Sequence, residues 1–178
     1  MERRYRIILF ALILGSFMTA LDATIVAVAL PTIAHDMGEA GHDTSNISWV
    51  LLIYTLMLCC FILLWSKIGS NIGYKKVFII GITIFTISSL AIGICGLMPE
   101  LGLMSIIILR GVQGLGAGMS MSMSLAMVSS YLPAESRGSC IGAVTLSSSA
   151  GTAFGPAIGG ILTSVHWSYI FLINVPIG

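Results

Sequence analysis

The chain has 178 residues, of which 57% are hydrophobic and only 8% are charged, and its formal net charge is +1. Water-soluble domains carry about 25% charged residues, so this composition excludes an ordinary soluble protein and indicates a chain that lies in lipid. The near-zero net charge also argues against nucleic-acid binding, because that function needs a basic surface.

Five long apolar segments predict five transmembrane helices, at residues 7–31, 48–66, 76–97, 103–131 and 138–163. Each is close to or above the about 20 residues with which a helix crosses the hydrocarbon layer, whereas membrane strands have only about 10 residues. Residues 169–178 start a partial sixth helix that is too short to span, so the chain end is expected at the outer surface. We predict an all-α polytopic membrane protein with a single transmembrane domain over residues 1–178.

The first apolar segment also has features of a signal peptide. Basic residues precede it, and Ala27-Val28-Ala29 has the small side chains of a cleavage site. The segment is long for a signal peptide, carries Asp22 and is followed by four more spans. An uncleaved first helix is therefore the simpler interpretation.

Basic residues are confined to alternate connections between the predicted helices, and this bias predicts the orientation. The segments before helix one, between helices two and three, and between helices four and five contain Arg3, Arg4, Arg6, Lys67, Lys75, Lys76 and Arg137. The other connections have no Lys or Arg, and the first two of them carry Asp36, Glu39, Asp43 and Glu100. We expect a multi-pass protein of the plasma membrane with a cytoplasmic N-terminus.

Asp22 in the first segment and Arg110 in the fourth are ionisable residues at membrane depth. Each costs about 2.5 to 3.5 kcal/mol on insertion scales when it faces lipid, so a partner is expected. The two helices run in opposite directions, and the depths of the two residues allow an ion pair. Such residues by default mark proton, ion or substrate sites, although a purely structural pair between two helices remains the alternative.

Polar and small residues form two stripes on the fourth segment. Gln113, Ala117, Ser120 and Ser124 follow Arg110 at helical spacing and predict the wall of a water-filled cavity. Thr19 and Gln113 lie one turn from the two charges and are candidate hydrogen-bond partners. The second stripe consists of Gly111, Gly114, Gly118 and Ser122.

The fifth segment repeats the glycine pattern with Gly151, Gly155 and Gly159. Small residues let helices approach closely in lipid. Pro156 removes one backbone hydrogen bond, which predicts a bend in this helix. The bend is either a hinge or the mark of a tight helix crossing.

Three stretches together carry a family resemblance: LDATIVAVALP at 21–31, RGVQGLGAG at 110–118 and SSAGTAFGPAIGG at 148–160. With them, the chain resembles the N-terminal half of major facilitator superfamily transporters, in particular the branch of fourteen-helix drug:proton antiporters. The resemblance associates the helix-four arginine, here Arg110, with proton translocation. It also identifies the helix-five stretch as an antiporter motif.

The resemblance implies proton-coupled efflux of hydrophobic or cationic drug-like molecules by alternating access. Arg110 would hold or tune a carboxylate, most plausibly that of Asp22, which a nearby cation keeps ionised while desolvation favours its protonated form. The implied partners are the lipid bilayer, protons, a hydrophobic small molecule and the missing C-terminal half. No enzymatic activity is expected, since no histidine that could serve as the base for a nucleophile lies within a span. No metal site is expected, because none of the four cysteines has metal-ligand spacing, and no cofactor is expected.

The sequence departs from the family in one cytoplasmic loop and in length. In SKIGSNIGYKK at 66–76, Gly73 and Lys75 match, but Ser70 replaces the aspartate of the usual gating network. A family half has six helices and a working transporter has two halves. The chain is therefore expected to be a fragment, a product of a split gene, or a damaged remnant. A non-transporting remnant or partner subunit is the alternative function, and facilitated uptake of a polar solute is a further one.

Overall fold

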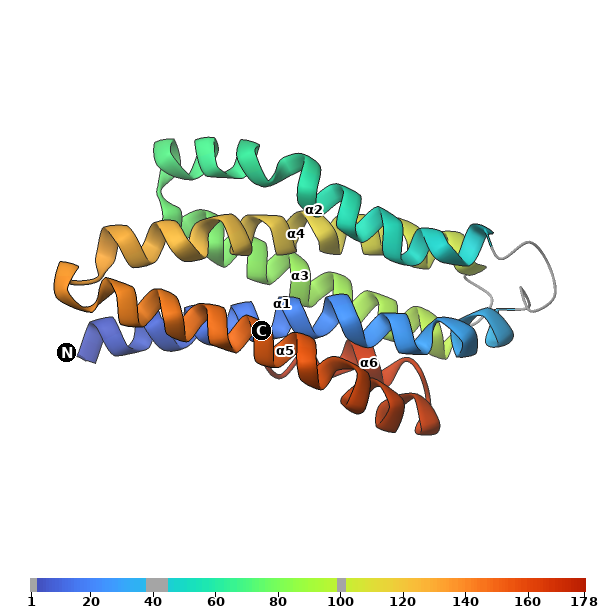
Figure 1. Ribbon diagram of the computed structural model, residues 1–178. Coiled ribbons are helices and arrows are strands. Elements are labelled where there is room, and N and C mark those ends of the chain that lie inside the picture. Colours follow the sequence, from blue (N-terminus) through green and yellow to red (C-terminus); the bar gives the residue numbers. More distant parts are fainter. Residues whose placement is uncertain (1–2, 38–44, 99–101) are drawn as a thin grey trace.

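The computed structural model describes residues 3–37, 45–98 and 102–178, and every regular element within these ranges is a helix. Five long helices run side by side along one axis (Figure 1). They are α1 (Arg3–Asp36), α2 (Ser45–Ile72), α3 (Tyr74–Leu97), α4 (Gly102–Tyr131) and α5 (Arg137–Val165). A short 3-10 helix, η2 (Ala134–Ser136), precedes α5, and one short helix, α6 (Tyr169–Leu172), follows it. The predicted all-α fold is confirmed.

The helices extend beyond the predicted apolar segments, most of all at the junction of α2 and α3. The loop predicted at 66–76 is helical except for Gly73, whose φ of 105° turns the chain between the two helices. Glycine adopts this φ without a steric penalty, because it has no Cβ atom. Ser70 consequently lies in the last turns of α2 and Lys75 in the first turn of α3. The apolar segments predict only the part of each helix that lies in lipid. The helices are longer, because their backbone hydrogen bonds continue into the polar residues on either side.

Length and composition mark four helices, α1 to α4, as candidate membrane spans. The fifth predicted span coincides with the helix α5, which has 29 residues but is rich in Gly, Ser and Thr and is not one of the four candidates, so its role as a span stays a prediction. At 1.5 Å per residue α5 is about 43 Å long, which is enough to cross a bilayer. It lies along α1 and runs in the same direction (Figure 1).

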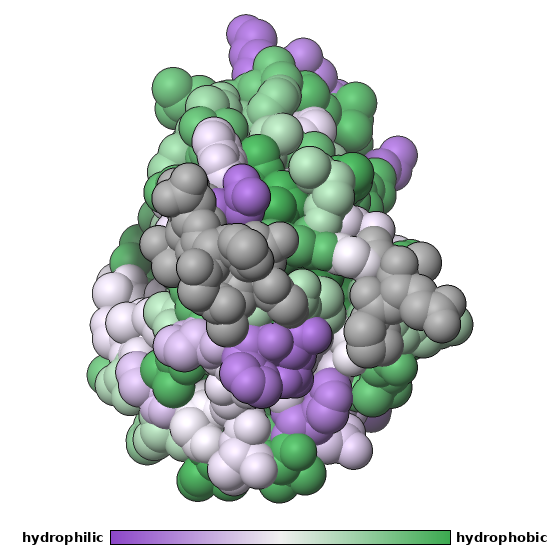
Figure 2. Space-filling model, turned by 90° about the vertical axis from the view of Figure 1, so that its right-hand side faces the viewer, coloured by the Kyte–Doolittle hydropathy of each residue, from purple (hydrophilic) through white to green (hydrophobic). Residues whose placement is uncertain are grey.

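One end of the bundle collects the basic residues. α1, α3 and α5 begin there and α2 and α4 end there (Figure 1). The described basic residues of this end are Arg3, Arg6, Lys67, Lys75, Lys76 and Arg137. The opposite end, shown face-on in Figure 2, has hydrophilic side chains near its centre, and Asp36 is exposed there. Glu39, Asp43 and Glu100, which were predicted to face outward, lie outside the described residues.

After α5 the chain turns back into the bundle instead of staying at its surface. Trp167, Ile170 and Phe171 are fully or almost fully buried, and Gly178 lies against Thr86 of α3. Residue 178 therefore lies near mid-length of the bundle (Figure 1). The expectation that the segment would end at the outer surface is wrong, because burial of large aromatic side chains draws the segment inward.

The two glycine stripes lie in the closest helix contacts. A Cβ atom at Gly114 would lie 2.5 Å from the carbonyl oxygen of Tyr54, so α4 and α2 meet backbone to backbone. A Cβ atom at Gly151 would lie 2.5 Å from the carbonyl oxygen of Phe17, which brings α5 equally close to α1. The other stripe members face the same partners: Gly111 and Gly118 face α2, and Gly155 and Gly159 face α1. α5 is continuous through Pro156, and its role as a hinge stays a prediction.

Candidate functional site

A buried ion pair between α1 and α4 forms the centre of the candidate site. Nη1 of Arg110 donates a hydrogen bond of 2.6 Å to Oδ2 of Asp22, and both side chains are completely buried. Two apolar clusters enclose this layer. One contains Ile25, Ile92 and Ile106, and the other lies toward the basic end of the same helices. The helices therefore bring the two predicted charges together at a depth without contact to water.

Two neutral amides complete the surroundings of the carboxylate. Oδ1 of Asp22 accepts hydrogen bonds from Nε2 of Gln113 at 3.1 Å and from Nδ2 of Asn174 at 3.0 Å. Together with the bond from Arg110, the carboxylate accepts three hydrogen bonds. Such a set of donors is suited to an ionised carboxylate, whose buried charge requires compensation.

Gln113 and Ser89 link the pair to α3 in a closed network. Oε1 of Gln113 accepts a bond of 2.7 Å from Arg110, while its Nε2 donates to Oγ of Ser89 at 2.5 Å. Ser89 also accepts from Asn174 at 3.3 Å. Because α1, α3, α4 and the segment after α6 each supply a member, a shift of any one of them alters the surroundings of Asp22.

Aromatic rings and a backbone carbonyl stabilise the guanidinium of Arg110. Its Nε donates to the carbonyl oxygen of Val50 at 3.2 Å. Its Cζ lies 4.2 Å from the ring centroid of Tyr54 and 5.6 Å from that of Phe171, both within cation–π range. The approach of α2 that places Tyr54 there depends on Gly114, one turn from Arg110. No described residue accepts a hydrogen bond from Nη2 of Arg110.

A cavity of about 440 Å³ lies beside the ion pair, between α1, α2, α4 and α5. Apolar and hydroxyl side chains line it, and the lining residues are Ser16, Thr19, Ala20, Ala23, Tyr54, Leu58, Met121, Ser124, Leu125, Val144, Thr145, Ser148 and Thr152. The lining contains no carboxylate or basic side chain, so the cavity is suited to a largely apolar molecule with a few hydrogen-bonding groups.

Two of the residues predicted for the substrate cavity line this cavity. Thr19 and Ser124 line the cavity, whereas Gln113, Ala117 and Ser120 are buried in helix contacts. Ala117 packs in a cluster with Met18 of α1 and Phe85 of α3. All members share one face of α4, but α1 and α3 cover that face along most of its length.

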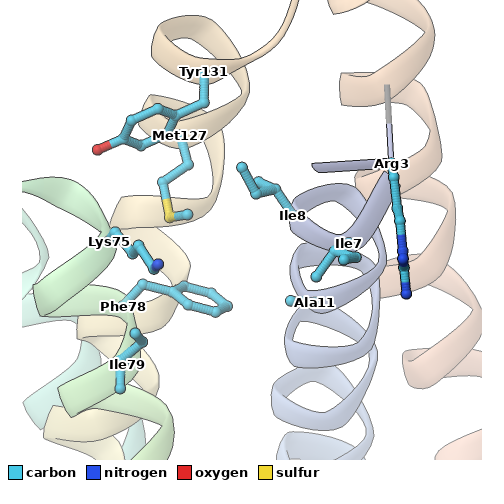
Figure 3. Close-up of a pocket in the computed structure, with 9 residues that line it drawn as sticks. All are labelled: Arg3, Ile7, Ile8, Ala11, Lys75, Phe78, Ile79, Met127 and Tyr131. Carbon is cyan, nitrogen blue, oxygen red and sulfur yellow. The ribbon is translucent and has the colours of Figure 1, made fainter. Parts of the chain in front are cut away.

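A larger groove, of about 550 Å³, lies away from the ion pair near the basic end. Ile7, Ile8 and Ala11 of α1 face Phe78 and Ile79 of α3 across it (Figure 3). Arg3 and Lys75 are also part of its lining (Figure 3). Its walls are mostly apolar and none of the ion-pair residues lines it, so this groove is not the candidate site.

Ser70 makes its hydrogen bond inside its own helix. Its hydroxyl donates to the carbonyl oxygen of Lys67 at 2.7 Å, and the side chain is exposed. Within the described ranges, no group of three or more His, Cys, Asp or Glu side chains is placed to hold a metal ion.

Sequence reasoning missed Ser89, Asn174 and Tyr54. A serine in an apolar helix is common and carries no signal of its own. Asn174 had a usable signal, because a lone amide within the apolar stretch IFLINVPIG requires buried hydrogen-bond partners. Tyr54 lies among many apolar residues of α2, and only the structure shows which of them faces Arg110.

A comparison with known protein families shows to which family the chain belongs. Residues 12–178 match the sequence model of the Major Facilitator Superfamily. The chain belongs to this superfamily. It is therefore a membrane protein of a transporter family, as its apolar helices also indicate.

Similar proteins include several transporters. Multidrug resistance protein Stp of Mycobacterium tuberculosis (strain CDC 1551 / Oshkosh) is 38% identical over 180 residues, which cover 100% of this chain and 32% of Stp. Riboflavin transporter RibZ of Clostridioides difficile is 36% identical, with 97% of this chain and 36% of RibZ covered. The tetracenomycin C resistance and export protein of Streptomyces glaucescens is 33% identical, with 96% and 30% covered. The chain thus spans about a third of the length of these curated relatives.

Proposed function

We propose that this superfamily chain forms part of a longer transporter that exports hydrophobic or cationic drug-like molecules in exchange for protons. The observation that carries the proposal is the completely buried pair of Asp22 and Arg110, with 2.6 Å between its closest atoms. The transporter lies in the plasma membrane with its basic end in the cytoplasm. The export names of two similar proteins, a multidrug resistance protein and a tetracenomycin C export protein, support the substrate class.

Asp22 is the proton carrier in this proposal. It is the only acidic side chain buried among the described residues, since Asp36 and Glu135 are exposed. Protonation removes its charge and weakens its attraction to Arg110, which stays charged at all physiological pH values. The two protonation states therefore favour different arrangements of α1 and α4. Alternation between these arrangements moves a proton inward and the substrate outward.

Facilitated uptake of a polar solute is the second candidate function. The similarity to a riboflavin transporter favours it, and the hydroxyl groups along the cavity suit a polar heterocycle as well. Proton coupling separates the two candidates, because facilitated uptake needs no carboxylate that changes its protonation state.

The test uses the full-length transporter that contains this chain, reconstituted in vesicles with an imposed pH gradient. We expect Asp22→Asn to reduce gradient-driven transport of a drug to the level of empty vesicles, while exchange of labelled for unlabelled drug continues. The matched control is Asp36→Asn, which changes an exposed carboxylate of the same helix. Gradient-driven transport by Asp22→Asn at the rate of the unchanged protein would exclude Asp22 as the carrier.

A further inference from the structure

We propose that Tyr54 is the positioning residue through which a substrate in the cavity acts on the Asp22–Arg110 pair. This inference rests on the proposed function. It names the residue that would couple binding of the drug to release of the proton. An antiporter needs such a link, because an exchange is coupled only when substrate binding changes the affinity for the proton.

The cavity does not reach the charged groups directly. Asp22, Arg110 and Gln113 are completely buried, and none of them lines the cavity. Tyr54 lines the cavity and also has its ring 4.2 Å from the guanidinium carbon of Arg110. Phe171 is the other aromatic residue near the guanidinium, and it does not line the cavity. Tyr54 therefore contacts both the cavity and the guanidinium of the pair.

Tyr54 is almost completely buried, and from its place in α2 its side chain contacts both α1 and α4. Gly114 lies against its carbonyl oxygen, so α2 has no room to move toward α4. The phenol hydroxyl donates to the backbone carbonyl oxygen of Thr19 at 3.4 Å, and Thr19 lines the same cavity. A substrate that displaces or presses the ring therefore changes contacts with α1 and α4 together.

The direction of the coupling follows from the charge of Arg110. A ring seated on the guanidinium keeps Arg110 within reach of Asp22, and this arrangement stabilises the ionised carboxylate. A substrate with an aromatic or apolar group packs against the cavity side of Tyr54 and favours the seated ring. Substrate binding then favours loss of the proton from Asp22 to water, and protonation in turn favours release of the substrate.

The experiment measures protons released per substrate bound by the purified full-length transporter. Ethidium serves as a hydrophobic cationic probe whose fluorescence reports binding, and a pH indicator in weak buffer reports the protons. We expect Tyr54→Leu to bind ethidium but to release few or no protons, because the ring on Arg110 is gone. Tyr54→Phe keeps the ring and is expected to release as many protons as the unchanged protein.

Leu125→Ala is the matched control, because Leu125 lines the same cavity from α4 and its apolar side chain takes no part in the hydrogen bonds of the ion pair. It is expected to change the ethidium affinity and to leave the proton ratio unchanged. Tyr54→Met, whose long and flexible side chain has no ring, is expected to lose the protons as well and provides the test where Tyr54→Leu does not fold. A full proton ratio in a folded Tyr54→Leu or Tyr54→Met variant would overturn the role of Tyr54. Ethidium binding without proton release by the unchanged protein would instead overturn the proposed function.

Discussion

At the scale of single residues, neighbouring groups offset the cost of burying the charge of Arg110. Its charge has no contact with solvent, and Asp22, Gln113, Val50 and the ring of Tyr54 compensate it. Removal of one partner from a buried pair leaves an uncompensated charge and costs about 3 to 5 kcal/mol, whereas removal of both charges is often close to neutral. The ion pair therefore adds little net stability to the fold, but the fold is sensitive to the loss of either single charge.

A double-mutant cycle tests the energetic coupling between Asp22 and Arg110. We expect Asp22→Asn to lower the thermal unfolding midpoint, because the charge of Arg110 is then buried alone. Adding Arg110→Gln to Asp22→Asn is expected to restore most of the loss, measured as the unfolding midpoint in detergent. Arg137→Gln serves as the control, since Arg137 lies at the start of α5 and bonds to the carbonyl oxygen of Leu132. Additive losses of the two single changes would contradict the coupling.

The sequence predicts the charged members of the site and misses the neutral ones. Asp22 and Arg110 stand out because a charge in an apolar segment is costly wherever it is placed. The neutral members are harder to find, because a serine such as Ser89 carries no signal of its own and its hydrogen bond to Asn174 joins residues 85 positions apart in the chain. Tertiary packing decides such contacts, and one helix face alone does not reveal them.

At the scale of the helices, two stripes of glycine set the distances in the bundle. Gly151 and Gly114 meet backbone atoms of α1 and α2, and a side chain in either place forces the helices apart. The periodicity of these glycines was visible in the sequence. Which helix each stripe meets was not, because a glycine pattern specifies a close approach without naming the partner.

Gly151→Ala is expected to lower the thermal stability, since the new Cβ atom would lie 2.5 Å from the carbonyl oxygen of Phe17. Gly142→Ala in the same helix is the matched control, because nothing lies within 4 Å of the added atom. It is expected to be neutral or to stabilise α5 by up to about 1 kcal/mol through higher helix propensity. Equal unfolding midpoints for the two variants would exclude a tight contact of α1 with α5 at Gly151.

The helices of the structure end at other residues than the apolar segments of the sequence, and this difference has a physical cause. α2 continues to Ile72, six residues past its predicted end, because Ser66, Lys67 and Asn71 are compatible with a helix outside lipid. α5 coincides with the fifth long apolar segment of the sequence, although its hydropathy is below that of the other four. The sequence therefore predicts the number and order of the long helices better than their limits.

At the scale of the whole molecule, the charges at the two ends predict the orientation in the membrane. The basic end carries the junction of α2 and α3, and the opposite end carries Asp36. Because basic residues usually remain on the cytoplasmic side, we expect Ser70 to lie inside the cell and His35 outside. The sequence alone predicts this arrangement, because it depends on the order of loops and not on packing.

Cysteine labelling in intact cells tests the orientation. In a variant without the natural cysteines, His35→Cys is expected to react with a membrane-impermeant thiol reagent, and Ser70→Cys is expected to react only after the cells are opened. Both side chains are exposed, so both react when accessible. Labelling of Ser70→Cys in intact cells would show the opposite orientation.

The most direct test of the account is whether a substrate gradient moves protons across the membrane. The full-length transporter is placed in vesicles without a pH gradient, a gradient of ethidium is imposed, and the internal pH is followed. We expect protons to move against the direction of ethidium movement, and we expect no proton movement with Asp22→Asn. Ethidium movement without any change of pH in the unchanged protein, or an undiminished pH change with Asp22→Asn, would contradict the account.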